Sequence, residues 1–229
     1  MGALFDSYIY NPIFEVLKFI YYQNLSFHDL GLSIVILTVL IRLILLPVFY
    51  KGAKDQTIIQ KIQPHIKKIQ LDHKDDKEKQ ARELMALYKE HRINPFSSIL
   101  FLLVQLPIFF ALFRIFSKEI TVAVFPTLSF FGLIQLNEKS LTLTIAAALL
   151  QYFQTKMTLA PKLNNGPRDS MAANQKMMMY IGPLITLIVL FNLPSAIGLY
   201  WTVSNLFSII QQFFINKKIN IPEATESVN

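Results

Sequence analysis

The chain has 229 residues, of which 53% are hydrophobic, 16% are charged and none is cysteine. Because a soluble domain of this size carries about 25% charged residues, the composition favours a polytopic membrane protein. The absence of cysteine excludes disulfides, a thiol nucleophile, cysteine metal sites and lipid attachment through cysteine. No cleavable signal peptide is expected, since Met1–Gly2 leads into a polar, aromatic opening without a basic segment.

Residues 1–30 predict an extracytoplasmic helix that lies at the membrane surface. After Asn11–Pro12, a typical helix start, five apolar residues recur at helical spacing: Ile13, Phe14, Leu17, Ile20 and Tyr21. Many aromatic residues and few charges favour an interfacial helix over a membrane-crossing one. A soluble amphipathic helix is less favoured, because this region offers little core for it to pack on.

Residues 31–50 predict the first membrane span, closed by Pro47 and Lys51. Arg42 is the single charge within it, and a charge at the bilayer centre costs about 3 kcal/mol on insertion scales. We therefore expect Arg42 to face a protein interior or a water-filled cavity, with Thr38 one turn earlier on the same helical face. The alternative is an arginine that extends to the lipid headgroups; it is less favoured because apolar residues flank Arg42 on both sides.

Residues 51–94 hold eleven Lys or Arg and seven Asp or Glu, too many charges for a bilayer segment. Isoleucines recur at helical spacing from Ile58 to Ile69, and a second apolar stripe runs from Ala81 to Tyr88. The segment therefore predicts a helical hairpin outside the membrane, with Pro64 bending or interrupting its first arm.

Four further spans are predicted in the remainder of the chain. From Met177 to Asn216 no residue is charged, and one helix of that length would measure about 60 Å, twice a bilayer core of about 30 Å. The stretch is therefore divided by a tight hairpin at 192–195. The predicted spans are 95–116, 140–158, 176–192 and 195–216. An extracytoplasmic connector, expected to be an interfacial loop or short helix, is predicted at 117–139. A cytoplasmic loop is predicted at 159–175 and a cytoplasmic tail at 217–229.

The predicted fold class is thus all-α: a polytopic membrane protein of five transmembrane helices, with a cytoplasmic hairpin and an N-terminal interfacial helix. This topology puts seventeen of the 22 basic residues on one side of the membrane, which predicts an N-terminus outside and a C-terminus in the cytoplasm. The net charge of +7 then reflects topology, and no direct nucleic-acid sequence recognition is expected.

The sequence offers little support for catalysis. Apart from Arg42, no predicted span has a charged residue or histidine near its centre, as proton-coupled transporters usually do. The three histidines of the hairpin lack HExxH spacing, and no nucleotide-binding GxxxxGK[ST] motif is present. We expect neither an enzyme nor a cofactor or metal site.

Three segments resemble the YidC/Oxa/Alb family of membrane protein insertases. They are TVLIRLILLPV (38–48), INPFSSILFLLVQLPIFFALF (93–113) and QKMMMYIGPLITLIVLFNLPSAIGLYWTVSNLFSIIQQ (175–212). The order of five spans and the charged hairpin after the first also match. The resemblance implies a bacterial-type plasma membrane protein with nascent client membrane proteins and the lipid bilayer as partners, and with the Sec translocon and the ribosome as further candidates. Two features differ from larger members: no signal-anchor span with a large extracytoplasmic domain precedes the first span, and the tail lacks a long basic extension.

The resemblance also implies a hydrophilic groove that contains Arg42 and is open to the cytoplasm and the lipid. Thr38 and Trp201 fall at positions where the family has groove contacts. Gln105 and Gln151 are polar groups within apolar spans, and Tyr200–Trp201 fits an interfacial aromatic belt and a groove lining equally well. The candidate client-binding residues are Arg42, Thr38, Gln105, Gln151, Trp201 and Tyr200. The competing function is a small channel or transporter with Arg42 as an anion-binding site.

Overall fold

The computed structural model describes residues 2–23, 25–94, 97–158 and 170–219. Most of the predicted loop 159–175 and tail 217–229 lies outside these described residues. The helices and strands are α1 (Ala3–Phe5), η1 (Asp6–Tyr10), α2 (Asn11–Tyr22), α3 (Leu30–Ile44), α4 (Leu46–Lys61), α5 (Gln63–Asp72), α6 (Lys77–Glu90), α7 (Ser97–Arg114), η2 (Ile115–Glu119), β1 (Ser129–Phe130), β2 (Ile134–Gln135), α8 (Leu141–Thr158), α9 (Ser170–Leu190) and α10 (Ser195–Lys218).

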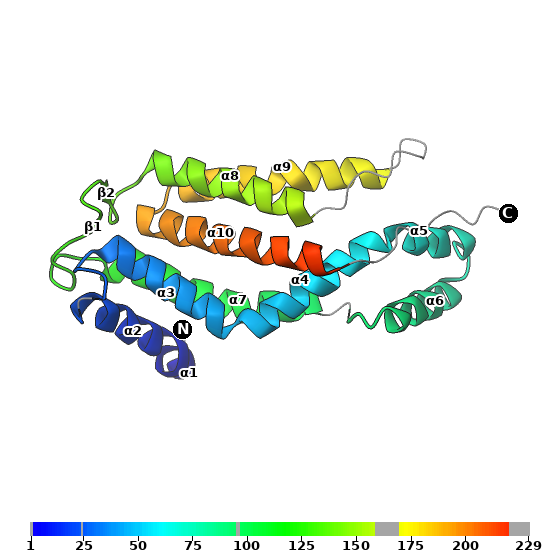
Figure 1. The fold of residues 1–229 in the computed structure, drawn as a ribbon, viewed down its shortest axis with the longest axis horizontal. Coiled ribbons are helices and arrows are strands. Elements are labelled where there is room, and N and C mark those ends of the chain that lie inside the picture. Colours follow the sequence, from blue (N-terminus) through cyan, green and yellow to red (C-terminus); the bar gives the residue numbers. More distant parts are fainter. Residues whose placement is uncertain (1, 24, 95–96, 159–169, 220–229) are drawn as a thin grey trace.

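The fold is an elongated helical bundle. Helices α3, α4, α7, α8, α9 and α10 follow its long axis, the α5–α6 hairpin projects from one end, and the strands lie at the opposite end (Figure 1). The predicted helical character is confirmed. Among the described residues, no single helix has both the length and the apolar composition needed to cross a membrane; α3 and α4 meet the two requirements only as a bent pair.

The first predicted span differs from the helices found. Helix α3 ends at Ile44, and the chain bends by 69° before α4. Pro47 does not close a helix but lies in the first turn of α4, where its missing N–H costs no hydrogen bond. Helix α4 continues through Lys51 to Lys61, so the first arm of the predicted hairpin is an extension of this second helix.

The hairpin arms are α4–α5 and α6. The predicted interruption at Pro64 is confirmed, because α4 ends at Lys61 and α5 begins with Pro64 in its first turn. The base of the hairpin packs on α10 as well as on itself. Its buried cluster joins Ile58, Ile62, Ile66 and Ile93 to Ile215 and Ile219, residues from the C-terminal end of α10 and just beyond it.

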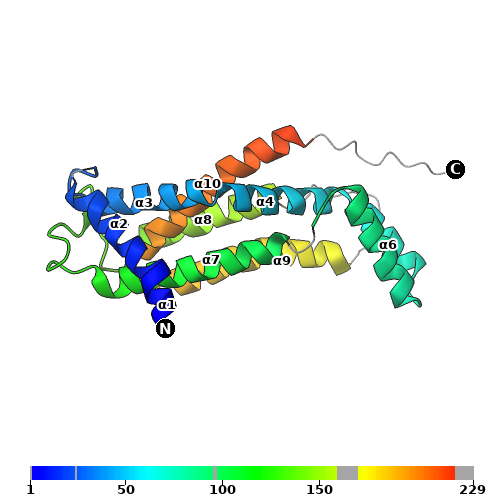
Figure 2. The ribbon, with the colours of Figure 1, turned by 90° about the horizontal axis from the view of Figure 1, so that it is seen from below.

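The N-terminal helix was predicted incorrectly in two respects. It begins at Ala3 rather than after Asn11–Pro12, because a π-helical turn, η1, leads directly into α2. It also has a core to pack on, since Leu17, Ile20 and Tyr21 are at most 1% exposed. Helices α1 and α2 cross the bundle obliquely (Figure 2). An ion pair of 2.5 Å between Arg114 Nη1 and Asp6 Oδ1 also holds this helix to the end of α7.

The predicted connector is mostly irregular, but it also contains a short antiparallel sheet of β1 and β2 that was not predicted. Phe130 pairs with Ile134 in its register, and the turn uses positive φ angles at Phe131 (49°) and Gly132 (71°). Asp29 fixes this turn to α3. One carboxylate oxygen accepts from the Phe131 N–H, and the other caps α3 at the Leu32 N–H. The connector is therefore tied to the start of the first long helix.

The chain turns between α9 and α10 at the predicted hairpin. The first N–H groups of α10 have no partner within the helix, and the connector supplies acceptors for them. Ser195 donates to the Glu138 carbonyl at 2.7 Å, and Ala196 donates to the Leu136 carbonyl at 3.0 Å. Helix α9 begins at Ser170, earlier than the predicted 176.

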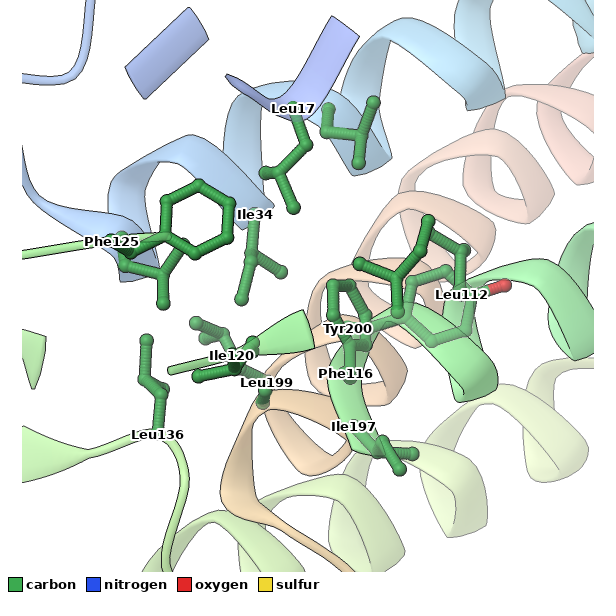
Figure 3. Close-up of a cluster of buried hydrophobic side chains, with 14 of the residues drawn as sticks. Leu17, Ile34, Leu112, Phe116, Ile120, Phe125, Leu136, Ile197, Leu199 and Tyr200 are labelled. Atoms are coloured by element: carbon green, nitrogen blue, oxygen red, sulfur yellow. The ribbon is translucent and has the colours of Figure 1, made fainter. Parts of the chain in front are cut away.

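The main hydrophobic core lies at the end of the bundle that carries the strands. Side chains from α2, α3, α7, the connector and α10 converge there (Figure 3). Ile34, Leu112, Phe116 and Phe125 are at most 2% exposed. This packing closes one end of the bundle.

Candidate functional site

A polar cavity of about 340 Å³ lies in the half of the bundle nearer the hairpin. Three helices each contribute one face at i, i+3, i+4 and i+7 or similar spacing, and Arg42 of α3 and Gly182 of α9 complete the wall. The lining from α4 is Phe49, Gly52, Ala53 and Gln56; from α8 it is Gln151, Gln154, Thr155 and Thr158; from α10 it is Ser208, Gln211 and Gln212.

Arg42 is the cation of this cavity and is 8% exposed. Its Nε donates to Ser204 Oγ at 3.4 Å, and its guanidinium lies 4.9 Å from the centre of the Phe49 ring, across the bend between α3 and α4. The ring face is electron-rich and so stabilises a cation. In the described parts of the chain no ion pair involves Arg42, and no acidic residue lines the cavity. The cavity therefore has one positive charge and neutral walls that combine polar side chains with Phe49, Gly52, Ala53 and Gly182.

The neutral wall offers the amide groups of its glutamines and the hydroxyl groups of Thr155, Thr158 and Ser208. Thr155, Thr158 and Ser208 each donate their hydroxyl hydrogen to a carbonyl of their own helix at 2.8 to 2.9 Å, which leaves their oxygen lone pairs as acceptors. Gln212 is already engaged, since it donates to Thr57 at 2.9 Å and to Asn216 at 2.8 Å. The described residues contain no group of three or more His, Cys, Asp or Glu suited to a metal ion. The wall thus presents hydrogen-bonding groups, and the residues that line it include no nucleophile–base pair.

The six predicted site residues fall into two sets. Arg42 and Gln151 line the cavity; Trp201 does not line it, but its indole Nε1 donates to Gln151 Oε1 at 3.3 Å. Thr38 donates to the Ile34 carbonyl of its own helix and does not line the cavity.

The remaining two residues, Gln105 and Tyr200, bond to each other. Gln105 Nε2 donates to the Tyr200 hydroxyl at 2.7 Å. Tyr200 lies beside Phe116 in the core (Figure 3) and is 5% exposed. Neither residue lines the cavity, so their polar groups connect α7 to α10 within the packed part of the bundle.

Several cavity residues were not predicted. On α8, Gln154, Thr155 and Thr158 continue the face of Gln151; on α10, Ser208, Gln211 and Gln212 form a matching stripe. Ser204, one turn before Ser208, does not line the cavity but accepts from Arg42. Both stripes are visible in the sequence as polar residues at helical spacing inside apolar helices. They identify the helix face that meets Arg42.

Comparison with known proteins agrees with this fold. Residues 21–223 match the family model described as 60Kd inner membrane protein. The chain is 34% identical over 215 residues to "Membrane protein insertase YidC" of Fusobacterium nucleatum, covering 93% of this chain and 98% of that one. It is 32% identical over 213 residues to the protein of the same name from Geobacter sulfurreducens, where it spans 38% of the longer relative.

A solved structure described as "Active YidC insertase crystal structure with the first transmembrane domain resolved" has the same fold. Its TM-score is 0.65 at 23% identity, over 93% of this chain and 47% of that chain. The family resemblance seen in the three segments is confirmed by these matches. The chain therefore belongs to the 60Kd inner membrane protein family, whose relatives named above are YidC membrane protein insertases.

Proposed function

We propose that this protein is a membrane protein insertase that receives polar segments of client proteins in the Arg42 cavity. The observation that carries the proposal is the Arg42 charge, which is enclosed by the bundle and faces amides and hydroxyls rather than an acid. The names of the relatives support the same role.

The cavity would act by shortening the low-dielectric path that a polar segment must cross. Two unit charges 4 Å apart attract by about 4 kcal/mol at an effective dielectric constant of 20, so an acidic client segment gains most from approaching Arg42. In this proposal the apolar client helix then moves into lipid beside the first and last long helices. The packed core at the other end supports a groove that is closed on that side and open toward the hairpin.

We propose an inner-membrane topology of five spans, with the N-terminus outside and the hairpin and C-terminus in the cytoplasm. Large apolar side chains such as Ile44, Leu149 and Ile188 are exposed on the outer faces of the helices, as lipid contact requires. A reporter after Asn229 and one near Asp75 should both be cytoplasmic, and one at Thr127 should be outside. Reporters at Asp75 and Thr127 on the same side would contradict this topology. The Sec translocon and the ribosome are candidate partners of the cytoplasmic side.

The role of Arg42 is tested with two substitutions and two clients. If the charge attracts polar segments, Arg42→Lys should retain much of the insertion of a client with an acidic translocated tail, and Arg42→Ala should lose most of it. A client with an uncharged tail should be affected less. Reconstituted protein supplies insertion yields, and melting temperature in detergent supplies the control.

Two outcomes would replace the proposal. Equal loss of both clients together with a lowered melting temperature would make Arg42 a structural residue. Flux of a small anion through reconstituted protein that does not insert clients would indicate a channel or transporter with Arg42 as its anion site.

A further inference from the structure

A second cavity, of about 280 Å³, lies between α8 and α9, on the face of α8 next to the one that lines the Arg42 cavity. It is lined by Ile145, Ala148, Leu149, Tyr152, Pro183 and Leu187. The tyrosine hydroxyl is the one side-chain polar group in this lining, and Tyr152 stacks on Tyr180 of α9 with ring centres 6.0 Å apart. Pro183 lies inside α9 at the cavity wall.

The lining favours an apolar occupant over water. A water molecule in a protein cavity needs about two to four polar partners, and an apolar cavity of about 150 Å³ stays dry and accepts hydrocarbon. This cavity is larger and open at the surface. Leu149 in the lining is 54% exposed, and Leu184 and Ile188, each next to a lining residue in the sequence, are 55% and 61% exposed. A flexible hydrocarbon chain could thus enter from the outer surface of the bundle.

One basic residue continues the cavity-lining face of α8. Ala148, Tyr152 and Lys156 follow at four-residue intervals, so Lys156 lies about 6 Å along the helix beyond Tyr152 on the same face. Lys156 is exposed and lies in the last turn of α8. In the described part of the chain no ion pair involves it. An apolar cavity with a cation at one end matches a lipid that has an acyl chain and an anionic headgroup.

We propose that this cavity holds one acyl chain of an anionic phospholipid whose phosphate rests on Lys156. The site requires that α8 and α9 face lipid, but it does not depend on client insertion or on Arg42. An ordered lipid there would fill the gap at Pro183 and hold α8 and α9 in their present spacing. Phospholipid composition would then influence the stability of the α8–α9 pair.

The test uses single-tryptophan variants in nanodiscs. Trp201 is the one tryptophan of the chain, so Trp201→Phe removes the native tryptophan fluorescence. Leu184→Trp places a probe beside the cavity, and Leu103→Trp on α7 is a control at a residue that is also exposed. The nanodiscs contain phosphatidylcholine and a stepwise increasing fraction of brominated phosphatidylglycerol or of brominated phosphatidylcholine as quencher, so that each titration yields an apparent affinity.

We expect brominated phosphatidylglycerol to quench the Leu184→Trp probe with about fivefold higher apparent affinity than brominated phosphatidylcholine, because one lysine attracts an anionic headgroup. Lys156→Gln should abolish this preference, and Ala148→Phe, which fills the cavity, should reduce quenching by both lipids. The Leu103→Trp control should show no preference. Equal quenching by the two lipids at Leu184→Trp would overturn the proposal. So would a probe shielded from both lipids, which would indicate that a second copy of the chain or a client helix occupies the face.

Discussion

A buried hydrogen bond at the base of the hairpin provides a sharp test of the structure. Ser97 at the start of α7 donates its hydroxyl to Asp55 Oδ2 of α4 at 2.5 Å. Asp55 is 4% exposed, Ser97 is 7% exposed, and the two residues lie 42 positions apart in the sequence. The bond therefore joins the two ends of the charged segment 51–94 at its root. We expect it to contribute measurably to the stability of the bundle.

The magnitude follows from burial and charge. A hydrogen bond to a charged group contributes about 1.5 to 3 kcal/mol, and the loss of one partner leaves the other buried and unsatisfied. Asp55→Ala and Ser97→Ala should each destabilise the protein by about that amount. For a chain of this length the loss corresponds to a fall in melting temperature of about 3 to 12 °C. The double variant should fall little further, because one bond is lost in each case.

The assay is a double-mutant cycle measured by melting in detergent. Ser7→Ala and Asp75→Ala are matched controls, because both residues are exposed and should leave the melting temperature nearly unchanged. A coupling energy near zero, with the two single losses adding in the double variant, would show that the residues do not act on each other. Equal melting of all variants would show that the root of the hairpin does not contribute to stability.

Two further predictions concern the strand-bearing end of the bundle. Gly31→Ala should lower the melting temperature, because an added Cβ would lie 2.3 Å from the Phe130 ring and overpacking costs about 1 to 3 kcal/mol. Gly2→Ala is the control, since an added Cβ there would have no atom within 4 Å. Equal melting temperatures for the two variants would contradict the close packing of Gly31 against Phe130. Burial, and then the hydrogen bond to Glu119, raise the pKa of Tyr10 from 10.0 to about 12. Because folding raises this pKa, the neutral Tyr10 hydroxyl stabilises the folded protein below pH 10, and this contribution is lost as the pH rises toward 12. Alkaline destabilisation should therefore be larger in the parent protein than in Tyr10→Phe. The same alkaline profile in both proteins would exclude this contribution.

The sequence predicted the polar interior better than the apolar packing. Arg42 and Gln151 were identified because a polar residue inside an apolar helix is costly unless it faces protein or water. Apolar residues carry no such information, since lipid and protein core accept the same side chains. Ile34 and Ile44 belong to one helix and have the same chemistry, yet the first is fully buried and the second is 74% exposed. The docking of α2 onto the core was missed for the same reason.

Long-range partners were also beyond sequence reasoning. The bonds from Gln105 to Tyr200 and from Trp201 to Gln151 join residues 95 and 50 positions apart. Whether a glutamine inside an apolar helix lines a cavity or bonds to a buried tyrosine depends on the neighbouring helix. The bend at Leu45 is a similar case, because Pro47 is compatible with the end of one helix and with the first turn of the next.

The two ends of the bundle differ because three helices change character along their length. Helix α10 is apolar from Ala196 to Leu199 and then presents Ser204, Ser208 and Gln212 to the interior. Helices α3 and α8 follow the same order, from core residues to Arg42 and to Gln151. Separating the core end would lose many close apolar contacts. The cavity end has fewer apolar contacts to lose. A polar client segment can there take the place of the water molecules that contact the cavity wall. If client segments enter the bundle, this difference favours entry from the hairpin side.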